Sequence, residues 1–385
     1  MQDKMNRILA ISYYHALVAG GGHRPHQILL EDLRQGREAV FISSSPTGLE
    51  AMQSIHGHGI YEKLAAYHLD SSDGQRLVPL TAHAMALLRQ HPTTNHLIND
   101  WRPTYVRAHN PVAAFIPFIE SLKSAGVPFV YDQMDMWSAF ATHPWGAASN
   151  TESRYMELAD AMTTISKFLL ERAPKHLKTH LIANAISSHF LEASANGNGY
   201  EPPRRDNSTK HILYMGAIWP DWFNWDLIFK LVIERPQYEF TFIGATSASV
   251  DEDDGRQPHK LAARLAKYPN VKLIGEIPHL ALLPWLRKAN IGLIPFLVND
   301  LTLACSPLKV FEYIGAGLRV AATDLPEIQD YPMVTTCADH AGMLACLDAA
   351  NDGDEVSRKA AKAFISDNTW SHRLARLDEL VGELL

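Results

Sequence analysis

The sequence predicts an α/β protein built from two doubly wound domains, and three observations support this. Short apolar runs rich in β-branched residues alternate with amphipathic helical patterns along almost the whole chain. The alternation is broken once, by a segment rich in Gly, Asn, Pro and charge at 194–210. The chain has 385 residues, a length that suits two domains. Two βα series separated by a linker indicate two parallel sheets, each covered by helices.

The first series contains six runs with strand composition. Most of them are almost continuously apolar, as expected for parallel strands that helices cover on both faces. Helical patterns lie between them at 24–36 and 111–124. The strands are expected at 7–12, 38–43, 105–110, 128–132, 161–166 and 180–185.

The second series repeats the pattern after the linker. Strands are expected at 211–216, 239–245, 271–276, 291–296, 319–324 and 333–337, with helices near 224–234, 257–267, 279–289 and 307–316. We therefore expect an N-terminal domain at 1–197, a C-terminal domain at 208–367 and a closing helix at 368–385. Because doubly wound sheets bind ligands beyond the carboxyl ends of their strands, two such domains predict a site in the cleft between them.

Composition and charge exclude several classes of protein. The net charge of -7 argues against a nucleic-acid-binding protein. The three cysteines have no disulfide or zinc spacing. His56 and His58 lack a third metal ligand nearby, so we expect no metal. No apolar run reaches the ~18 residues of a membrane span, and the first one is too short for a signal peptide. The expectation is a cytoplasmic protein, either free or peripheral at the inner face of a membrane.

The stretch that begins at Ser306 has the composition of a phosphate site. Ser306 suits the N-cap of a helix and Pro307 its first position, so Lys309 falls in the first turn and Glu312 on the same face. The N-terminus of a helix offers free N–H groups and a positive dipole end, and Lys309 adds a cation. The alternative is a capped surface helix on which Lys309 and Glu312 are only solvated.

This stretch resembles a known family motif. The pattern Ser-Pro-Leu-Lys-x-x-Glu-Tyr-x-x-x-Gly, followed by a strand and "TDLPEI", resembles the donor-binding motif of GT-B glycosyltransferases, of the bacterial exopolysaccharide and capsule type. Their fold consists of two Rossmann-like domains facing a cleft that holds a nucleotide-sugar. The resemblance continues in both halves, at 130–140, 157–172, 181–186, 212–228, 240–245 and 367–381.

The resemblance assigns residues to the donor. It implies that Ser306, Pro307 and Lys309 hold the diphosphate and that Glu312 binds the ribose. Gly216 and Gly244, at the ends of two strands, would let the backbone approach the nucleotide. 

The sequence near this motif leaves alternatives for the aromatic loop at 219–225 and for the position of Ala304. Trp219 or Trp222 would pack on the base or the sugar, or these side chains belong to the core. Retaining members carry a second glutamate at the position of Ala304, and this chain lacks it. The stereochemistry of the retaining members therefore cannot be carried over, and resemblance to inverting glucuronosyltransferases stays an alternative.

On the acceptor side, "VYDQMD" resembles the strand end that carries the catalytic aspartate of inverting exopolysaccharide transferases, at the position of Asp135. An inverting transferase needs a base for the attacking hydroxyl, and a carboxylate at a strand end suits this role. We expect Asp132 to cap the turn instead. The alternative is that both acids cap turns. Trp137 stays open between an acceptor platform and core.

The first half of the chain offers two further candidate contacts for the substrates. The Gly-rich turn with Gly21, Gly22, His23 and Arg24 leads into a helix and suits contact with a sugar or an anionic acceptor. The segment "RPHQ" resembles the same transferases, whereas a surface loop is the plain alternative. His109 ends a strand and would bond the donor sugar or be satisfied within its loop.

The sequence thus predicts a hexosyltransferase-type glycosyltransferase for surface polysaccharide synthesis. It would move a sugar from a nucleotide-diphosphate sugar to a hydroxyl of a glycan or lipid-linked acceptor, with no metal or other cofactor and no nucleic-acid partner. Inversion with Asp135 as base is preferred. The alternatives are a nucleotide-sugar epimerase or hydrolase on the same fold, and a non-catalytic binding protein for glycans or nucleotides.

Overall fold

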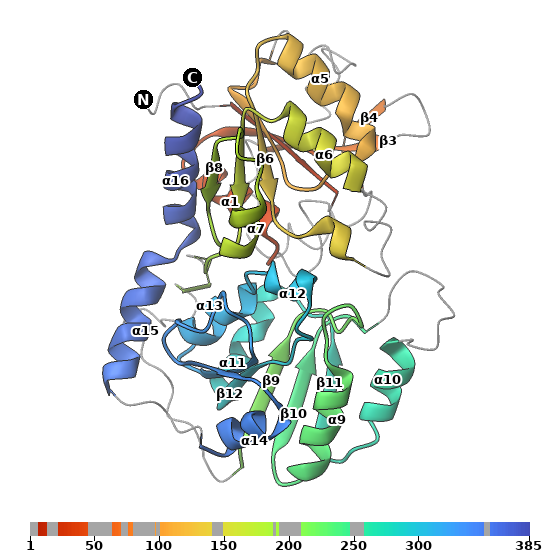
Figure 1. The fold of residues 1–385 in the computed structure, drawn as a ribbon, viewed down its shortest axis with the longest axis vertical. Coiled ribbons are helices and arrows are strands. Elements are labelled where there is room, and N and C mark those ends of the chain that lie inside the picture. The colour runs from red at the N-terminus through yellow and green to blue at the C-terminus, as the bar shows by residue number, and fades with distance from the viewer. Residues whose placement is uncertain are drawn as a thin grey trace. The chain divides into compact units, whose positions relative to one another are not determined.

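The computed structural model describes residues 7–13, 22–44, 64–70, 76–79, 97, 101–140, 149–187, 190–191, 209–246, 258–349 and 355–385. The chain divides into two compact units (Figure 1). Unit 1 comprises Met1–Asn184 and Trp370–Leu385, and unit 2 comprises Ala185–Thr369. Most of the linker expected at 194–210 lies outside the described residues.

Unit 1 contains an eight-stranded sheet with the order β4-β3-β2-β1-β5-β6-β7-β8. All neighbours pair in parallel except β3 and β4, which are antiparallel. The six expected strands are present, and β3 and β4 are additional. The strands are β1 (Arg7–Ser12), β2 (Glu38–Ser43), β3 (Leu64–Asp70), β4 (Arg76–Pro79), β5 (Tyr105–Ala108), β6 (Phe129–Gln133), β7 (Ala161–Thr164) and β8 (Thr179–Leu181).

The helices of unit 1 bury apolar stripes against this sheet. A core of Leu9, Val106, Phe129 and their neighbours lies under α5 and α6. Described helices are α1 (Arg24–Arg34), η4 (Ala113–Phe115), α5 (Ile116–Ser124), η5 (Trp137–Ala139), α6 (Ser149–Leu158), α7 (Lys167–Arg172) and α16 (Trp370–Gly382).

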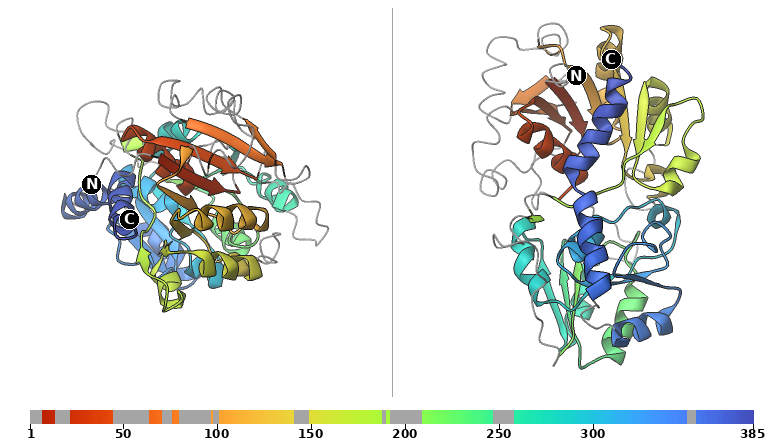
Figure 2. Two further views of the ribbon diagram at one scale, coloured as in Figure 1. Left: turned by 90° about the horizontal axis from the view of Figure 1, so that it is seen from above. Right: turned by 90° about the vertical axis from the view of Figure 1, so that its left-hand side faces the viewer.

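The last helix of the chain, α16, packs against α1, near the start of the chain (Figure 2). An ionic contact accompanies this packing: Arg37 donates from Nη1 to Asp378 Oδ1 at 2.9 Å and to Asp32 Oδ1 at 3.1 Å. Asp32 in turn accepts from Arg107 Nη2 at 2.8 Å. Side chains from three distant parts of the sequence therefore form one buried charge network.

Unit 2 contains a six-stranded, wholly parallel sheet with the order β11-β10-β9-β12-β13-β14. All six strands expected here are present. They are β9 (His211–Met215), β10 (Glu239–Ile243), β11 (Val271–Gly275), β12 (Ile291–Ile294), β13 (Arg319–Thr323) and β14 (Val334–Cys337). Strands are added on one side of β9 up to β11 and on its other side from β12 onward, so the switch point of the sheet lies at the carboxyl ends of β9 and β12.

Helices cover both faces of this second sheet, around a core that includes Leu213, Phe242 and Leu293. Asn224 caps α9 by accepting from Leu227 N–H at 3.0 Å. The described helices are α9 (Trp225–Glu234), α10 (Pro258–Leu265), η7 (His279–Leu282), α11 (Leu283–Lys288), α12 (Asp300–Leu303), α13 (Leu308–Gly315), α14 (His340–Ala349) and α15 (Glu355–Asp367). Within the described ranges, no helix has the length and hydropathy needed to cross a membrane.

Candidate functional site

Two glycines bring the ends of β9 and β10 together in unit 2. Gly216 has φ +117° and Gly244 has φ +152°, a region that L side chains rarely adopt. A Cβ at Gly244 would lie 1.9 Å from the carbonyl oxygen of Gly216. A Cβ at Gly216 would lie 3.1 Å from Lys309 Nζ. Both positions therefore require glycine, and Gly216 lies directly beside the lysine of the predicted phosphate site.

The helix of that site, α13, begins at Leu308, one residue later than expected. Pro307 is its N-cap and no side chain caps its N-terminus. Ser306 therefore precedes the cap, and it is buried. Because no side chain caps this end, the first N–H groups of α13 stay available. Such groups bind anions at the N-termini of helices in other proteins.

Lys309, in the first turn of α13, is half-buried and lies between two aromatic rings. Its Nζ is 4.8 Å from the ring centroid of Tyr214 and 4.5 Å from that of Phe296. Burial lowers the pKa of Lys309 to about 8, against the opposing effects of Cys305 and Glu312. Among the described residues no carboxylate forms an ion pair with this ammonium, so it remains available to an anion.

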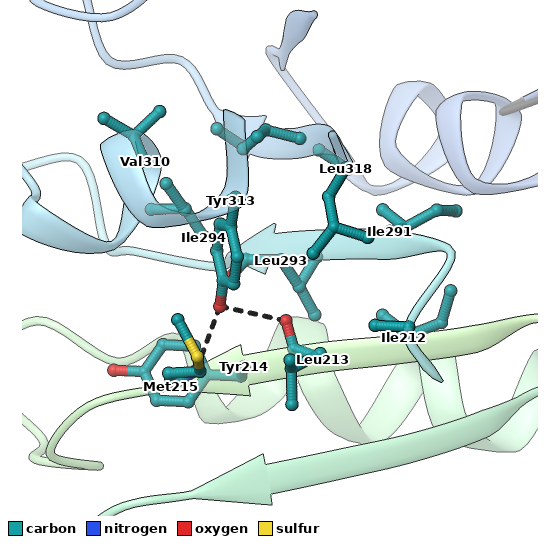
Figure 3. Packing of buried hydrophobic residues seen from close by; sticks show 14 of the residues in the cluster. Ile212, Leu213, Tyr214, Met215, Ile291, Leu293, Ile294, Val310, Tyr313 and Leu318 are labelled. Carbon is teal, nitrogen blue, oxygen red and sulfur yellow. Dashed lines mark hydrogen bonds between the residues drawn. The ribbon is translucent and has the colours of Figure 1, made fainter. Parts of the chain in front are cut away.

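Tyr313 holds α13 in place (Figure 3). Its hydroxyl donates to the carbonyl oxygen of Leu213 at 3.0 Å and accepts from Met215 N–H at 3.0 Å, both on β9. The ring lies over Gly292 of β12, where a Cβ would come within 2.4 Å of it. The helix that carries Lys309 and Glu312 is thus anchored to the two strands at the switch point.

Glu312 contacts a residue that the sequence analysis did not single out. Its Oε1 bonds His279 Nε2 at 2.5 Å, and the His279 ring stacks on Phe190 with centroids 4.9 Å apart. The other oxygen, Oε2, has no hydrogen-bond partner among the described residues. Within the described part of the chain, Glu312 therefore keeps one acceptor oxygen unused, and His279 orients the carboxylate. A histidine at the first position of a short helix carries no sequence pattern that distinguishes this role.

The loop after β9 carries a stacked tryptophan pair. The rings of Trp219 and Trp222 lie 6.0 Å apart, and both side chains are half-buried. Trp222 Nε1 donates to the carbonyl oxygen of Ala217 at 3.0 Å. Trp222 is thus tied to its own loop, and Trp219 stacks on it with part of its surface exposed.

Ala304 ends α12, whose start is closed by a capping box between Asn299 and Thr302. The side chain of Ala304 is fully buried. The position that bears the earlier glutamate in retaining transferases therefore offers no polar group here.

In unit 1, Asp132 lies at the end of β6 and is fully buried with side-chain partners. Arg24 donates to both of its oxygens at 2.8 Å, His109 Nδ1 bonds it at 2.7 Å, and Thr163 Oγ1 donates at 2.5 Å. Burial would raise its pKa, but Arg24 and His109 outweigh this and hold the pKa well below its usual range. The expectation that Asp132 caps a turn is wrong, because its partners among the described residues are side chains and not backbone N–H groups.

The same network occupies Arg24 and His109. Arg107 Nε donates to His109 Nε2 at 3.2 Å, so the ring carries its proton on Nδ1 and donates to Asp132. Burial lowers the pKa of His109 to about 4, so the ring is neutral. Both nitrogens are used internally, and this arrangement supports the satisfied histidine rather than the sugar contact. Arg24 likewise points inward, with only 3% of its surface exposed.

The remaining acceptor-side residues differ in their exposure. Trp137 is fully buried and stacks on Phe140 with centroids 5.6 Å apart, as a core residue does. His23 is exposed at the N-cap of α1, and Gly22 beside it is half-buried. Gly21 lies outside the described residues.

Asp135, two residues beyond β6, is half-buried and has no hydrogen-bond or ion-pair partner among the described residues. Burial, and then the negative charge of Glu152, raise the pKa of Asp135 to about 7. Glu152 itself accepts from Tyr131 at 2.9 Å and from Gln133 at 2.8 Å. An aspartate with unoccupied oxygens and a pKa near neutrality has the properties of a general base.

Comparison with solved structures shows the fold. Sucrose-phosphate synthase from Thermosynechococcus elongatus is similar over 98% of this chain and 99% of its own, with a TM-score of 0.70 and 12% identity. A glycosyltransferase from Rickettsia africae matches over 98% of both chains, with a TM-score of 0.67 and 12% identity. Anabaena HepE, solved in complex with UDP-glucose, matches over 98% of this chain and 99% of its own, with a TM-score of 0.65 and 12% identity.

The chain has the GT-B fold. The fold class expected from the sequence is confirmed. No family model matches the chain. One curated relative, the putative teichuronic acid biosynthesis glycosyltransferase TuaH of Bacillus subtilis, is 26% identical in an alignment 237 positions long that covers 54% of this chain and 53% of TuaH. The chain thus spans about half the length of this relative.

Within this GT-B chain, the structure groups the predicted donor residues. Gly216, Gly244, Lys309 and Glu312 all lie at the carboxyl end of the unit 2 sheet. In unit 1, Asp135 has a raised pKa and no hydrogen-bond partner among the described residues, whereas Arg24 and His109 belong to the internal network around Asp132. In the described ranges, no group of three or more His, Cys, Asp or Glu side chains could hold a metal ion.

Proposed function

We propose that the protein is a glycosyltransferase that moves a sugar from a nucleotide-diphosphate sugar to a hydroxyl group of an acceptor. The observation that carries the proposal is the Lys309 ammonium beside Gly216 at the uncapped start of α13, with Glu312 one turn further on. A cation and free N–H groups suit a diphosphate, and an acid one turn away suits a ribose. The GT-B fold and the similarity to TuaH support the same activity.

The diphosphate is the leaving group, and its charge grows as the glycosidic C–O bond breaks. Lys309 and the first N–H groups of α13 stabilise this charge where it develops. Tyr313 fixes these donors by its two hydrogen bonds to β9, so they need not reorganise during the reaction. In this proposal the protein's own cation and dipole neutralise the leaving group, without a metal.

Asp135 is the proposed base. As the acceptor oxygen attacks the anomeric carbon, its proton passes to the Asp135 carboxylate and the nucleoside diphosphate leaves with the bonding electrons. A pKa of about 7 suits proton uptake near neutral pH. Ala304 lacks the carboxylate that retaining members place near the sugar, which supports inversion.

The proposed role is surface polysaccharide assembly. TuaH is named for teichuronic acid biosynthesis, and HepE was solved with UDP-glucose and with UDP and glucose. By analogy we propose a hexosyl nucleotide as donor and a glycan or a lipid-linked sugar as acceptor. The proposed location is the cytoplasm, with peripheral contact at the inner face of the membrane.

Calorimetry and product analysis test the proposal. UDP or GDP should bind the purified protein, and Lys309→Ala should weaken the binding about 10-fold or more. Supplied with donor and acceptor, the protein should form a glycosylated product, and Asp135→Asn should slow this at least about 100-fold while nucleotide affinity stays unchanged. Donor turnover without an acceptor would instead indicate an epimerase or hydrolase. Nucleotide binding with no turnover would indicate a binding protein.

A further inference from the structure

We propose that Tyr214 and Phe296 are positioning residues that hold the Lys309 ammonium between two aromatic faces. This inference rests on the proposed function for its biological meaning, because the caged lysine is the residue proposed to hold the diphosphate. The cage itself consists of contacts within unit 2.

The distances place both rings in range of a cation–π interaction. Lys309 Nζ lies 4.8 Å from the Tyr214 centroid and 4.5 Å from the Phe296 centroid, inside the ~6 Å limit for such contacts. The third side is Gly216, where a Cβ would lie 3.1 Å from Nζ and 3.2 Å from Cε. The lysine side chain is thus confined on three sides while its ammonium has no acidic partner among the described residues.

Aromatic faces suit a cation that must bind phosphate. A carboxylate partner would stabilise the ammonium, but it would also neutralise the charge and occupy N–H donors. A ring face stabilises the charge and leaves the N–H donors for an incoming anion. The cage therefore orders a long, flexible side chain without weakening its attraction for a diphosphate.

Both rings are themselves held in place. Tyr214 is fully buried, donates to the carbonyl oxygen of Ala217 at 2.7 Å and packs edge-on against Phe223, with centroids 4.9 Å apart. Phe296 is 4% exposed, and its backbone pairs with Phe223 in an isolated antiparallel bridge. Phe223 therefore connects the two walls of the cage.

The groups around Lys309 define how its charge responds to pH. Burial lowers its pKa to about 8, and Cys305 and Glu312 act in the opposite direction. Glu312 is bonded to His279, and burial raises the pKa of Tyr214, which stays neutral. A lysine is charged below its pKa, so anion binding should weaken as the pH rises past about 8. Loss of one ring face should lower the pKa, because the ring favours the charged form.

Phe296→Leu tests the cage, since it keeps an apolar side chain but removes the ring face. Titration of the Lys309 side chain by NMR, in the protein without nucleotide, should give a midpoint about one pH unit below that of the unmodified protein. Phe242→Leu is the matched control: its ring is buried in the same core and lies 6.3 Å from Tyr214, but it does not face the ammonium. This control should leave the midpoint unchanged.

Calorimetry with UDP and GDP at pH 6 to 9 gives a second readout. The affinity of the Phe296→Leu variant for these nucleotides should lie within about 2-fold of that of the unmodified protein at pH 6. At pH 8 it should be about 3- to 10-fold lower. An unchanged Lys309 midpoint, or an equal loss of affinity at every pH, would overturn the proposed cage and make Phe296 a packing residue. If the unmodified protein binds neither nucleotide at any pH, the proposed function fails instead, and the NMR titration still decides the cage.

Discussion

The carbonyl oxygen of Gly216 occupies the space that a side chain at Gly244 would need. A Cβ there would lie 1.9 Å from that oxygen and 2.5 Å from the carbonyl carbon. The backbones that follow β9 and β10 therefore contact each other directly, and no side chain fits between them. This close contact sets the position of Gly216 beside Lys309.

Gly244→Ala should therefore destabilise unit 2. The added methyl group meets backbone atoms that cannot rotate away, and φ +152° is unfavourable for alanine. We expect a loss of about 2–4 kcal/mol in the free energy of unfolding, measured by urea denaturation, and weaker nucleotide binding. Gly126→Ala is a control with positive φ but open space around its Cβ, and its loss should be smaller, about 1 kcal/mol. Equal losses at both positions would contradict the steric argument.

The two aspartates after β6 should respond in opposite ways to replacement by asparagine. Asp132→Asn leaves the buried Arg24 without its carboxylate, and we expect a loss of about 3–5 kcal/mol. Asp135 has a raised pKa, so its charged form is disfavoured in the folded protein. Asp135→Asn should keep or increase stability at pH 8 and abolish transfer. Urea denaturation and product formation measure the two effects, and a stable, active Asp132→Asn variant would refute the assigned roles.

The pH profile of kcat/KM should be bell-shaped. Asp135 must lose its proton to act as base, so activity should rise as the pH passes about 7. Lys309 must keep its proton, so activity should fall as the pH passes about 8. A profile with no change between pH 6 and 9 would exclude both assignments.

Glu152→Gln should move the acidic limb of that profile. Glu152 is the second cause of the raised pKa of Asp135, after burial. Without this charge the limb should shift to lower pH, while the alkaline limb stays in place. Glu157→Gln is the control, since Glu157 lies on the same helix and pairs with Arg154 at the surface. A shift with the control variant as well would indicate a general charge effect.

His279→Gln tests whether Glu312 binds ribose. Because His279 orients the Glu312 carboxylate, its loss should raise the KM for the donor about 5- to 10-fold with a smaller effect on kcat. The preference for a ribose donor over its 2′-deoxy and 3′-deoxy analogues should fall in parallel. His340→Gln, which alters a more exposed pair with Glu234, should change neither. An undiminished preference for ribose would place the ribose elsewhere.

Asp378→Asn should weaken the docking of α16 in unit 1. It removes the carboxylate that holds Arg37, a residue with only 7% of its side chain exposed. We expect a loss of about 1–3 kcal/mol on urea denaturation. Glu383→Gln is the control: Glu383 directly follows α16 and forms an exposed ion pair with Lys178. Its replacement should lower the free energy of unfolding by less than about 1 kcal/mol. Similar losses in both variants would show that the Arg37 network does not contribute to the stability of the fold.

Much of the fold could be predicted because it depends on local patterns. All twelve expected strands are present, since apolar β-branched runs signal buried parallel strands wherever they occur. Among the described residues the structure adds the strands β3 and β4 and the helices α6, α7, α12, α14 and α15. The sequence predicts a strand to 110, but β5 ends at Ala108, and the polar side chains of His109 and Asn110 that follow it form hydrogen bonds with Asp132 and Ser12.

The sequence by itself determined the two βα series and the placing of Lys309 and Glu312 on one helix face. These features follow from spacing along the chain, where residues three or four apart on a helix are neighbours. The sequence also determined that Gly216 and Gly244 allow close contact between backbones, because glycine has no side chain.

Only the tertiary structure decided which groups those residues meet. Arg24 and Asp132 are 108 positions apart, and Glu312 and His279 are 33 apart. No sequence period connects such pairs, because sheet order brings them together. Tertiary contacts therefore made Asp132 the centre of an ionic network and placed two aromatic rings around Lys309, while Asp135 has no partner within the described part of the chain.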